Sequence, residues 1–289
     1  MTVLLDPPAQ KPIAGIHSLE LEITSACQLK CRMCLSSSSP QASHGDMTPK
    51  DWRAVIFDAA ALGVRTIQMI GGEPTMHPKW REFVTLALSL GRHVEIYSNL
   101  YEVKERDWSL FADPRVTLGT SYYSDRPEEH DAVTQKEGSY VRTRANIVQA
   151  LERGIEVRAG IVDVLPGQRV AEGRAELEAM GITNIIVDRA RAVGRAALPG
   201  VKPSLDEMCG RCTRGRAAIL PTGDLTGCVL SRDFPAGNVL HTRLAELLGG
   251  KAWADLAASI SPVRADACPP DDSGDCGPAN TTACGPAYD

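Results

Sequence analysis

Short apolar runs alternate with helical patterns along the first two thirds of the chain, and this alternation restricts the fold more than any other feature. The runs predict strands over residues 19–24, 64–70, 94–97, 116–121, 155–162 and 184–187. The intervening patterns predict helices over 49–62, 78–90, 139–153 and 169–180, each followed by a glycine. Repeated strand–helix units build parallel sheets. Six units suit this length better than a closed eight-unit barrel of roughly 250 residues, so we expect an α/β fold, a partial (β/α)6 barrel.

The composition excludes several classes of protein. The 289 residues are 43% hydrophobic and carry a formal net charge of −5, which does not favour a nucleic-acid surface. We find no apolar run long enough to span a membrane and no secretory signal near Met1, so we predict a cytoplasmic protein with no membrane or nucleic-acid partner. Nine cysteines in a reducing compartment indicate metal ligation or catalysis rather than disulfides.

Three of the cysteines, Cys27, Cys31 and Cys34, follow the first predicted strand as C-x3-C-x2-C. Three thiolates can hold three irons of a [4Fe–4S] cube and leave the fourth iron open to a ligand. Loops at the carboxyl ends of parallel strands form the ligand crevice in such folds. We therefore expect this loop to meet the ends of the next three strands, which carry Gly71-Gly72-Glu73-Pro74, Asn99 and Ser121. A zinc site is the alternative for the triplet alone.

Triplet and glycine turn together resemble the signatures of the radical S-adenosylmethionine (SAM) superfamily. The resemblance implies that Cys27, Cys31 and Cys34 ligate a [4Fe–4S] cluster with an open iron, which binds SAM. It also implies that Gly71, Gly72, Glu73 and Pro74 hold the methionine end of SAM, and that Asn99 and Ser121 contact the ribose. Many members carry an aromatic residue before the third cysteine, where this chain has Met33; a thioether can pack in its place.

A second set of cysteines begins after residue 200. Cys209, Cys212 and Cys228 stand as C-x2-C-x10-G-x4-C around a predicted hairpin, 216–220 paired with 225–230. This pattern resembles the SPASM or twitch extension, which implies one or two auxiliary Fe–S clusters. Cys268, Cys276 and Cys284 would supply further ligands, or one of them a hydrogen atom to the substrate. Their even spacing departs from a full SPASM domain, and a zinc knuckle is the alternative.

The predicted organisation has three parts: an N-terminal extension over 1–16, a barrel core over 17–200 and a small cysteine-rich auxiliary-cluster domain over 201–289. Arg189, Arg191 and Arg195 either bind a carboxylate or phosphate or are solvated loop charges. The acidic run around His130, residues 128–131, reads as a charged turn rather than a metal site. Nothing in the sequence distinguishes His44 and His77 from surface histidines.

The resemblance implies an enzyme that forms a 5′-deoxyadenosyl radical and modifies a ribosomally made peptide by crosslinking, thioether formation or epimerisation. An external flavodoxin or ferredoxin would supply the electron. The short N-terminal extension leaves recognition of a leader peptide to a separate protein. Alternatives are radical chemistry on a small sugar- or nucleoside-like antibiotic precursor, a molybdenum-cofactor GTP cyclase without the usual terminal Gly-Gly, and a non-enzymatic electron carrier or zinc protein.

Overall fold

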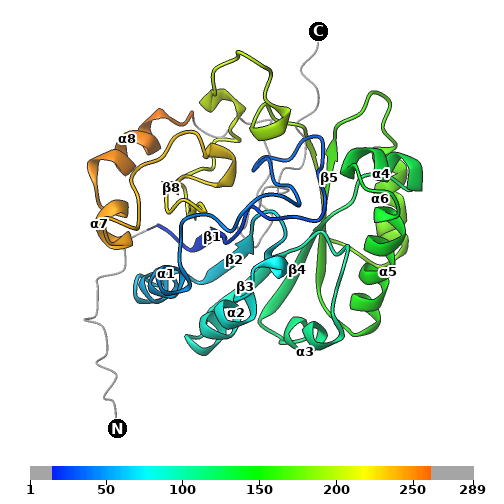
Figure 1. The fold of residues 1–289 in the computed structure, drawn as a ribbon, viewed down its shortest axis with the longest axis horizontal. Helices are drawn as coiled ribbons and strands as arrows, with labels where there is room; N and C mark the ends of the chain where they lie inside the picture. Colours follow the sequence, from blue (N-terminus) through cyan, green and yellow to red (C-terminus); the bar gives the residue numbers. More distant parts are fainter. Residues whose placement is uncertain (1–14, 262–289) are drawn as a thin grey trace.

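An open, twisted sheet forms the centre of the molecule in a computed structural model that describes residues 15–261 (Figure 1). Its strand order is β6-β5-β4-β3-β2-β1-β7-β8, and all neighbours are parallel except β7 and β8. The strands are β1 Ser18–Glu22, β2 Thr66–Ile70, β3 His93–Tyr97, β4 Val116–Ser121, β5 Val157–Asp163, β6 Ile185–Arg189, β7 Arg216–Ile219 and β8 Leu225–Thr226. The predicted α/β class and the six parallel units, β1 to β6, are confirmed.

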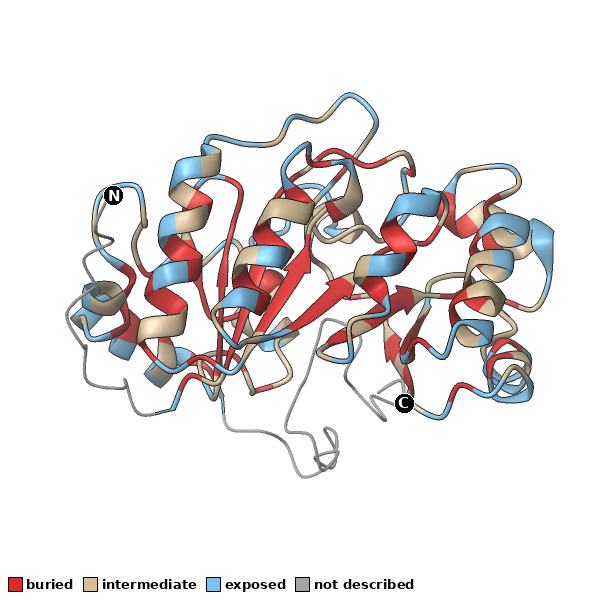
Figure 2. Ribbon diagram, turned by 90° about the horizontal axis from the view of Figure 1, so that it is seen from below, coloured by how far each residue is buried: buried red, intermediate tan, exposed pale blue. Residues whose placement is uncertain are grey.

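Helices follow the strands and cover the convex side of the sheet, while the long loop after β1 crosses its other side (Figure 1). The helices are α1 Pro49–Ala61, α2 Trp80–Ser89, α3 Trp108–Phe111, α4 Pro127–Thr134, α5 Ser139–Glu152, α6 Val170–Ala179, α7 Leu244–Leu248 and α8 Lys251–Ser259. Figure 2 shows the buried residues concentrated in the strands and on the sheet-facing sides of the helices. None of the helices in this part of the chain is long and apolar enough to cross a membrane.

Local sequence explains where α1 begins. The Thr48 hydroxyl accepts a hydrogen bond from the Asp51 amide, and the Asp51 carboxylate accepts one from the Thr48 amide, which makes a capping box. Pro49 occupies the first helical turn, where its missing N–H costs no hydrogen bond. The helix ends before Gly63, which has a φ of +80°, as the sequence predicts.

The hairpin of β7 and β8 extends the main sheet, because β7 pairs in parallel with β1. Arg216 on β7 forms a buried ion pair with Glu20 on β1 at 3.1 Å, and the Val229 amide donates to the same carboxylate at 2.8 Å. Arg232 reaches Glu22 at 3.0 Å. Burial raises the pKa of both carboxyl groups, and the two arginines oppose that shift. Residues after 200 are thus joined to the first strand, and the division at 200 into separate domains stays a prediction.

Two sequence expectations need correction. Residues 128–131 lie within helix α4, which begins at Pro127, and not in a turn; the proline at the first helical position was the available signal. The second hairpin strand is shorter than predicted, because a 3-10 turn at Val229–Ser231 follows Leu225–Thr226.

Candidate active site

An open cleft lies at the carboxyl ends of the parallel strands. Its walls come from the loop after β1, the ends of β2 to β6 and helices α4 and α5. Most of the residues predicted to hold the first cluster and SAM line it, namely Cys27, Cys31, Cys34, Gly71, Gly72, Asn99 and Ser121, together with Met33. The structure therefore brings together side chains that lie nearly a hundred residues apart in sequence.

Each of the three cysteine sulfurs has a hydrogen-bond donor close by. The Leu29 amide lies 3.4 Å and the Asn99 side-chain amide 3.5 Å from the Cys27 Sγ. The Ser38 amide lies 3.3 Å from the Cys34 Sγ. Cys31 has the Tyr123 hydroxyl as its side-chain partner. Donors aimed at sulfur suit thiolates and cluster sulfurs, which carry negative charge.

Burial also shapes the protonation of these thiols. Burial and the neighbouring Glu73 raise the pKa of Cys27 well above its usual range. Burial and the charge of Cys34 raise the pKa of Cys31 to about 12, while Arg195 and Tyr123 act in the opposite direction. The metal-free thiols of Cys27 and Cys31 are thus protonated at neutral pH, and a metal ion must displace their protons to bind.

The loop between β1 and α1 carries Cys27, Cys31 and Cys34 and is called here the cysteine loop. The turn Gly71-Gly72 packs directly against its start. The Gly72 amide donates to the Thr24 carbonyl at 2.8 Å, and the Glu73 amide donates to the Ala26 carbonyl at 2.9 Å. A Cβ atom on Gly72 would lie 2.7 Å from the Ala26 carbonyl carbon and 2.8 Å from the Ser25 oxygen. Contact with this backbone, besides any approach of a ligand, therefore requires glycine here.

Glu73 lies beneath the cleft wall and joins two of the strand-end loops. Its carboxylate accepts hydrogen bonds from the Ser98 hydroxyl at 3.0 Å and the Asn99 amide at 2.8 Å. It also accepts from the amide and the hydroxyl of Thr75, at 3.1 and 2.7 Å. Burial raises the pKa of this carboxyl, and the four donors oppose the rise. Glu73 and Pro74 are not among the cleft-lining residues, so contact of either with SAM stays a prediction.

The sequence interpretation did not include Tyr123 and Gln28, and it treated His130 only as part of a charged turn. Tyr123 lines the cleft at 5% exposure, and burial raises the pKa of its hydroxyl far above the usual range. Gln28 donates to the Asn99 side-chain oxygen at 3.2 Å. His130 is buried and lines the cleft, and its Nδ1 lies 3.0 Å from the Ser139 hydroxyl. The only sequence signal for Tyr123 was its place two residues after the end of β4.

The histidines and arginines left open by the sequence have definite partners. His44 Nδ1 lies 2.8 Å from the Thr24 hydroxyl. The ring centroids of His44 and buried His77 lie 5.0 Å apart. Arg191 is buried and forms a two-pronged ion pair with Asp188, with both distances 3.0 Å. The interpretation of Arg191 as a solvated charge is therefore wrong. Arg195 contacts the cysteine loop through the carbonyl oxygens of Cys31 and Ser38.

The second cysteine set also converges. The Sγ atoms of Cys212 and Cys228 lie 3.0 Å apart, and a hydrogen bond from Cys212 lowers the pKa of Cys209. Gly227 allows this approach, since a Cβ atom there would lie 2.8 Å from the Cys212 Cβ. Cys268, Cys276 and Cys284 lie outside the described residues. The contribution of any of these six cysteines to a metal site stays a prediction.

A family model described as the Radical SAM superfamily matches residues 21–177, which is more than half of the chain. The chain belongs to the radical SAM superfamily. Members use a [4Fe–4S] cluster and SAM. The three converging cysteines of this chain, with a donor at each sulfur and an open cleft beside them, fit such a cluster with one iron left free.

Curated relatives of this radical SAM chain share part of their length with it. The GTP 3′,8-cyclase of Tolumonas auensis is 31% identical over 121 residues, which cover 41% of this chain and 36% of that protein. The PqqA peptide cyclase of Xanthomonas campestris pv. campestris is 26% identical over 263 residues, which cover 87% of this chain and 66% of the cyclase. The chain thus spans less than two thirds of these relatives.

Solved radical SAM structures share the fold. SuiB of Streptococcus suis, bound to the precursor peptide SuiA, superposes with a TM-score of 0.71 at 16% identity, covering 86% of this chain and 67% of SuiB. BtrN, in complex with AdoMet and 2-DOIA, superposes with a TM-score of 0.55 at 13% identity, covering 86% of this chain and 88% of BtrN. At these identities the likeness extends to the fold alone.

Proposed function

We propose that this chain is a radical SAM enzyme that modifies a ribosomally made peptide with the help of an auxiliary Fe–S cluster. Cys27, Cys31 and Cys34 would hold the [4Fe–4S] cluster. When it is reduced by one electron, that cluster supplies the chemistry that cleaves SAM to methionine and a 5′-deoxyadenosyl radical, which takes a hydrogen atom from the substrate. A flavodoxin or ferredoxin would supply the electron.

The observation that carries this proposal is the convergence of three cysteines, the glycine turn and two polar strand ends on one cleft. In the proposal Gly71 and Gly72 contact the methionine end of SAM, and Asn99 and Ser121 contact the ribose. The Asn99 backbone is fixed by Glu73 at 2.8 Å, so this carboxylate would preorganise the ribose contact even without touching SAM. The Tyr97 hydroxyl, 3.4 Å from the Ser121 hydroxyl, would orient the second contact.

Cys209, Cys212 and Cys228 would ligate an auxiliary cluster, with the remaining ligands among Cys268, Cys276 and Cys284. The buried thiols of Cys212 and Cys228 lie 3.0 Å apart and Cys209 is hydrogen-bonded to Cys212, an arrangement that suits metal ligation better than isolated cysteines would. The peptide as substrate is supported by the likeness to the PqqA peptide cyclase over most of this chain and to SuiB, solved with its precursor peptide. A separate protein would recognise the leader sequence.

A second candidate is radical chemistry on a small molecule. The fold likeness to BtrN, solved with AdoMet and 2-DOIA, supports it, since it covers 86% of this chain and 88% of BtrN. Turnover would separate the candidates: a peptide encoded beside the gene should change in mass in the presence of SAM and a low-potential reductant. Consumption of a small sugar-like substrate with the peptide unaltered would favour the second candidate.

The core of the proposal is tested by anaerobic iron quantitation and by 5′-deoxyadenosine formation with dithionite. We expect wild-type protein to bind iron and to form 5′-deoxyadenosine. The variant with Cys27, Cys31 and Cys34 all changed to Ala should lose the iron of the first cluster and should form no 5′-deoxyadenosine. Cys212→Ala should retain SAM cleavage and lose product. A zinc-loaded, colourless wild-type protein, or SAM cleavage by the triple variant, would overturn the assignment.

A further inference from the structure

The segment that follows β6, residues 189–195, contacts both cysteine sites and is called here the bridge segment. At its far end the Arg195 amide donates to the Cys34 carbonyl at 2.9 Å. The Arg195 guanidinium donates from one nitrogen to the Cys31 carbonyl and from the other to the Ser38 carbonyl. One residue thus holds three carbonyl oxygens of the cysteine loop, from a position about 160 residues later in the chain.

Gly194 lets this contact form. Its φ is +61°, and a Cβ atom there would lie 2.5 Å from the Cys34 carbonyl oxygen. The adjacent carbonyl of Leu35 leaves no more room. A side chain at this position would therefore push the bridge segment away from the loop and take the Arg195 guanidinium with it.

The near end of the bridge segment holds the chain that leads to the second cysteine set. Arg189 forms an ion pair with Glu207 at 2.9 Å, and the Ala192 amide donates to the same carboxylate at 3.2 Å. Arg191 donates to the Glu207 carbonyl, and Glu207 lies two residues before Cys209. The bridge segment therefore contacts two regions through separate arginines. Arg195 binds the loop that carries Cys31 and Cys34, whereas Arg189 and Arg191 bind Glu207, just before Cys209.

The charge of Arg195 lies beside Cys31. Its guanidinium donates to the carbonyl oxygens of Cys31 and Ser38, so the cation is held against the backbone of a ligand residue. A cation at this place stabilises negative charge held at the Cys31 sulfur. A one-electron reduction adds one negative charge to a cluster and its thiolates, so a fixed cation beside a ligand favours the reduced form.

We propose that Arg195 is a positioning residue that fixes the cysteine loop and, through its charge, raises the reduction potential of the cluster that Cys27, Cys31 and Cys34 hold. The electron comes from an external low-potential donor. This inference rests on the proposed function only in requiring that the cluster be present.

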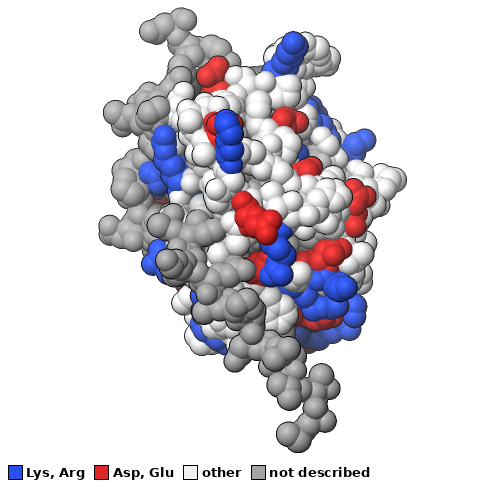
Figure 3. Space-filling view, turned by 90° about the vertical axis from the view of Figure 1, so that its left-hand side faces the viewer, with Lys and Arg blue, Asp and Glu red and all other residues white. Residues whose placement is uncertain are grey.

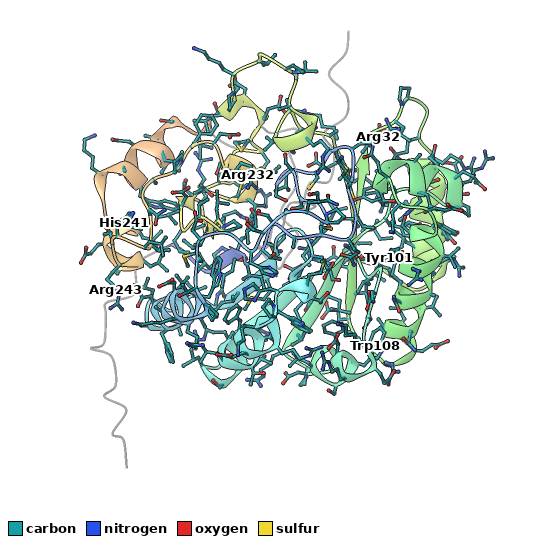
Figure 4. The ribbon with its side chains drawn as sticks, viewed as in Figure 1. Arg32, Tyr101, Trp108, Arg232, His241 and Arg243 are labelled. Atoms are coloured by element: carbon teal, nitrogen blue, oxygen red, sulfur yellow. The ribbon has the colours of Figure 1, made fainter. Side chains whose placement is uncertain are left out.

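The test compares Arg195→Gln with Arg195→Lys in anaerobically purified, iron-loaded full-length protein. Arg243→Gln is the matched control: it removes an equal charge at Asp58 of α1, beside α7 and far from the cysteine loop (Figure 4). Iron content is measured first, and the reduction potential is then determined by titration followed by electron paramagnetic resonance.

We expect the potential of Arg195→Gln to shift to more negative values, while Arg195→Lys and Arg243→Gln stay near wild type. A potential in Arg195→Gln equal to that of wild type would overturn the proposal. If Arg195→Gln loses its iron, Arg195→Lys decides. Wild-type iron content and potential in Arg195→Lys would support a role for the charge, whereas loss of iron in Arg195→Lys as well would overturn that role. Wild-type protein without iron would instead overturn the proposed function.

Discussion

Replacing Gly72 with Ala tests whether the glycine turn supports the cysteine loop as well as a ligand. The added methyl carbon would lie 2.7 Å from the Ala26 carbonyl carbon and 2.8 Å from the Ser25 oxygen, and both neighbours are backbone atoms that no rotamer change can move. Overpacking of this kind costs about 1–3 kcal/mol. Weakening the two hydrogen bonds to the Thr24 and Ala26 carbonyls adds about 0.5–1.5 kcal/mol each.

We therefore expect Gly72→Ala to lower the free energy of unfolding of the metal-free protein by about 2–6 kcal/mol, measured by urea denaturation under reducing conditions. Iron content should fall as well, because the shifted backbone carries Cys27. Gly91→Ala is the control: a Cβ atom there meets nothing within 4 Å, so only its φ of +74° opposes the change. It should cost about 1 kcal/mol and leave iron content unchanged. Wild-type stability and iron content in Gly72→Ala would refute the reasoning.

Three further predictions follow from buried groups. Glu73→Gln should lower the free energy of unfolding by about 1–3 kcal/mol, because an amide can accept from fewer of its donors; thermal unfolding at pH 7 would show this, and an unchanged midpoint would contradict it. Burial lowers the pKa of His130 from 6.5 to about 4, so the unfolded chain binds the extra proton and stability should fall by about 3 kcal/mol as pH drops from 6.5 to 4; subtracting the pH profile of His130→Phe should isolate this slope, and identical slopes would exclude it. Cys212→Ala should remove metal from the second site alone, so iron per chain should fall without loss of the first cluster's spectrum, whereas complete loss of iron would show that the two sites are not independent.

The order of elements was predictable because each rests on a local signal. Capping by Thr48 and Pro49, and glycines such as Gly63, mark helix ends independently of what packs around them. The convergence of Cys27 with Asn99 was predictable for a different reason: parallel strands present their carboxyl ends at one edge. Both inferences use chain direction and spacing, which the sequence records directly.

Partners across the sheet could not be predicted in this way. For Arg195 the sequence left an anion contact and a solvated loop charge open, and it did not indicate the carbonyls that bind this side chain, which belong to a loop about 160 residues away. For Glu73 the sequence suggested a contact with SAM, which stays a prediction, and it gave no sign that Ser98, Asn99 and Thr75 donate to this carboxylate. The sequence gives the charge of a side chain, and only the packed sheet determines which group neutralises it.

Charged side chains on the surface contribute less to the fold and the site than these buried partners do. On the face shown in Figure 3, lysine and arginine side chains alternate with acidic ones where described residues are visible. One exposed ion pair, Lys251 with Asp255 at 2.6 Å, joins adjacent turns of helix α8. Such pairs contribute about 0.2–1 kcal/mol, so substitutions at this pair should leave fold and site unaffected.

The parallel pairing of β1 with β7 sets an order of assembly. During synthesis the first strand leaves the ribosome about 200 residues before its neighbour Arg216, and until then it presents an unpaired edge together with two carboxylates, Glu20 and Glu22, that the finished sheet buries. Arg216 on β7 and Arg232 after β8 are therefore needed to neutralise the two carboxylates of the first strand. A nascent chain that stops short of them leaves the loop with Cys27 attached to a strand that has one unpaired edge and two carboxylates without their arginine partners.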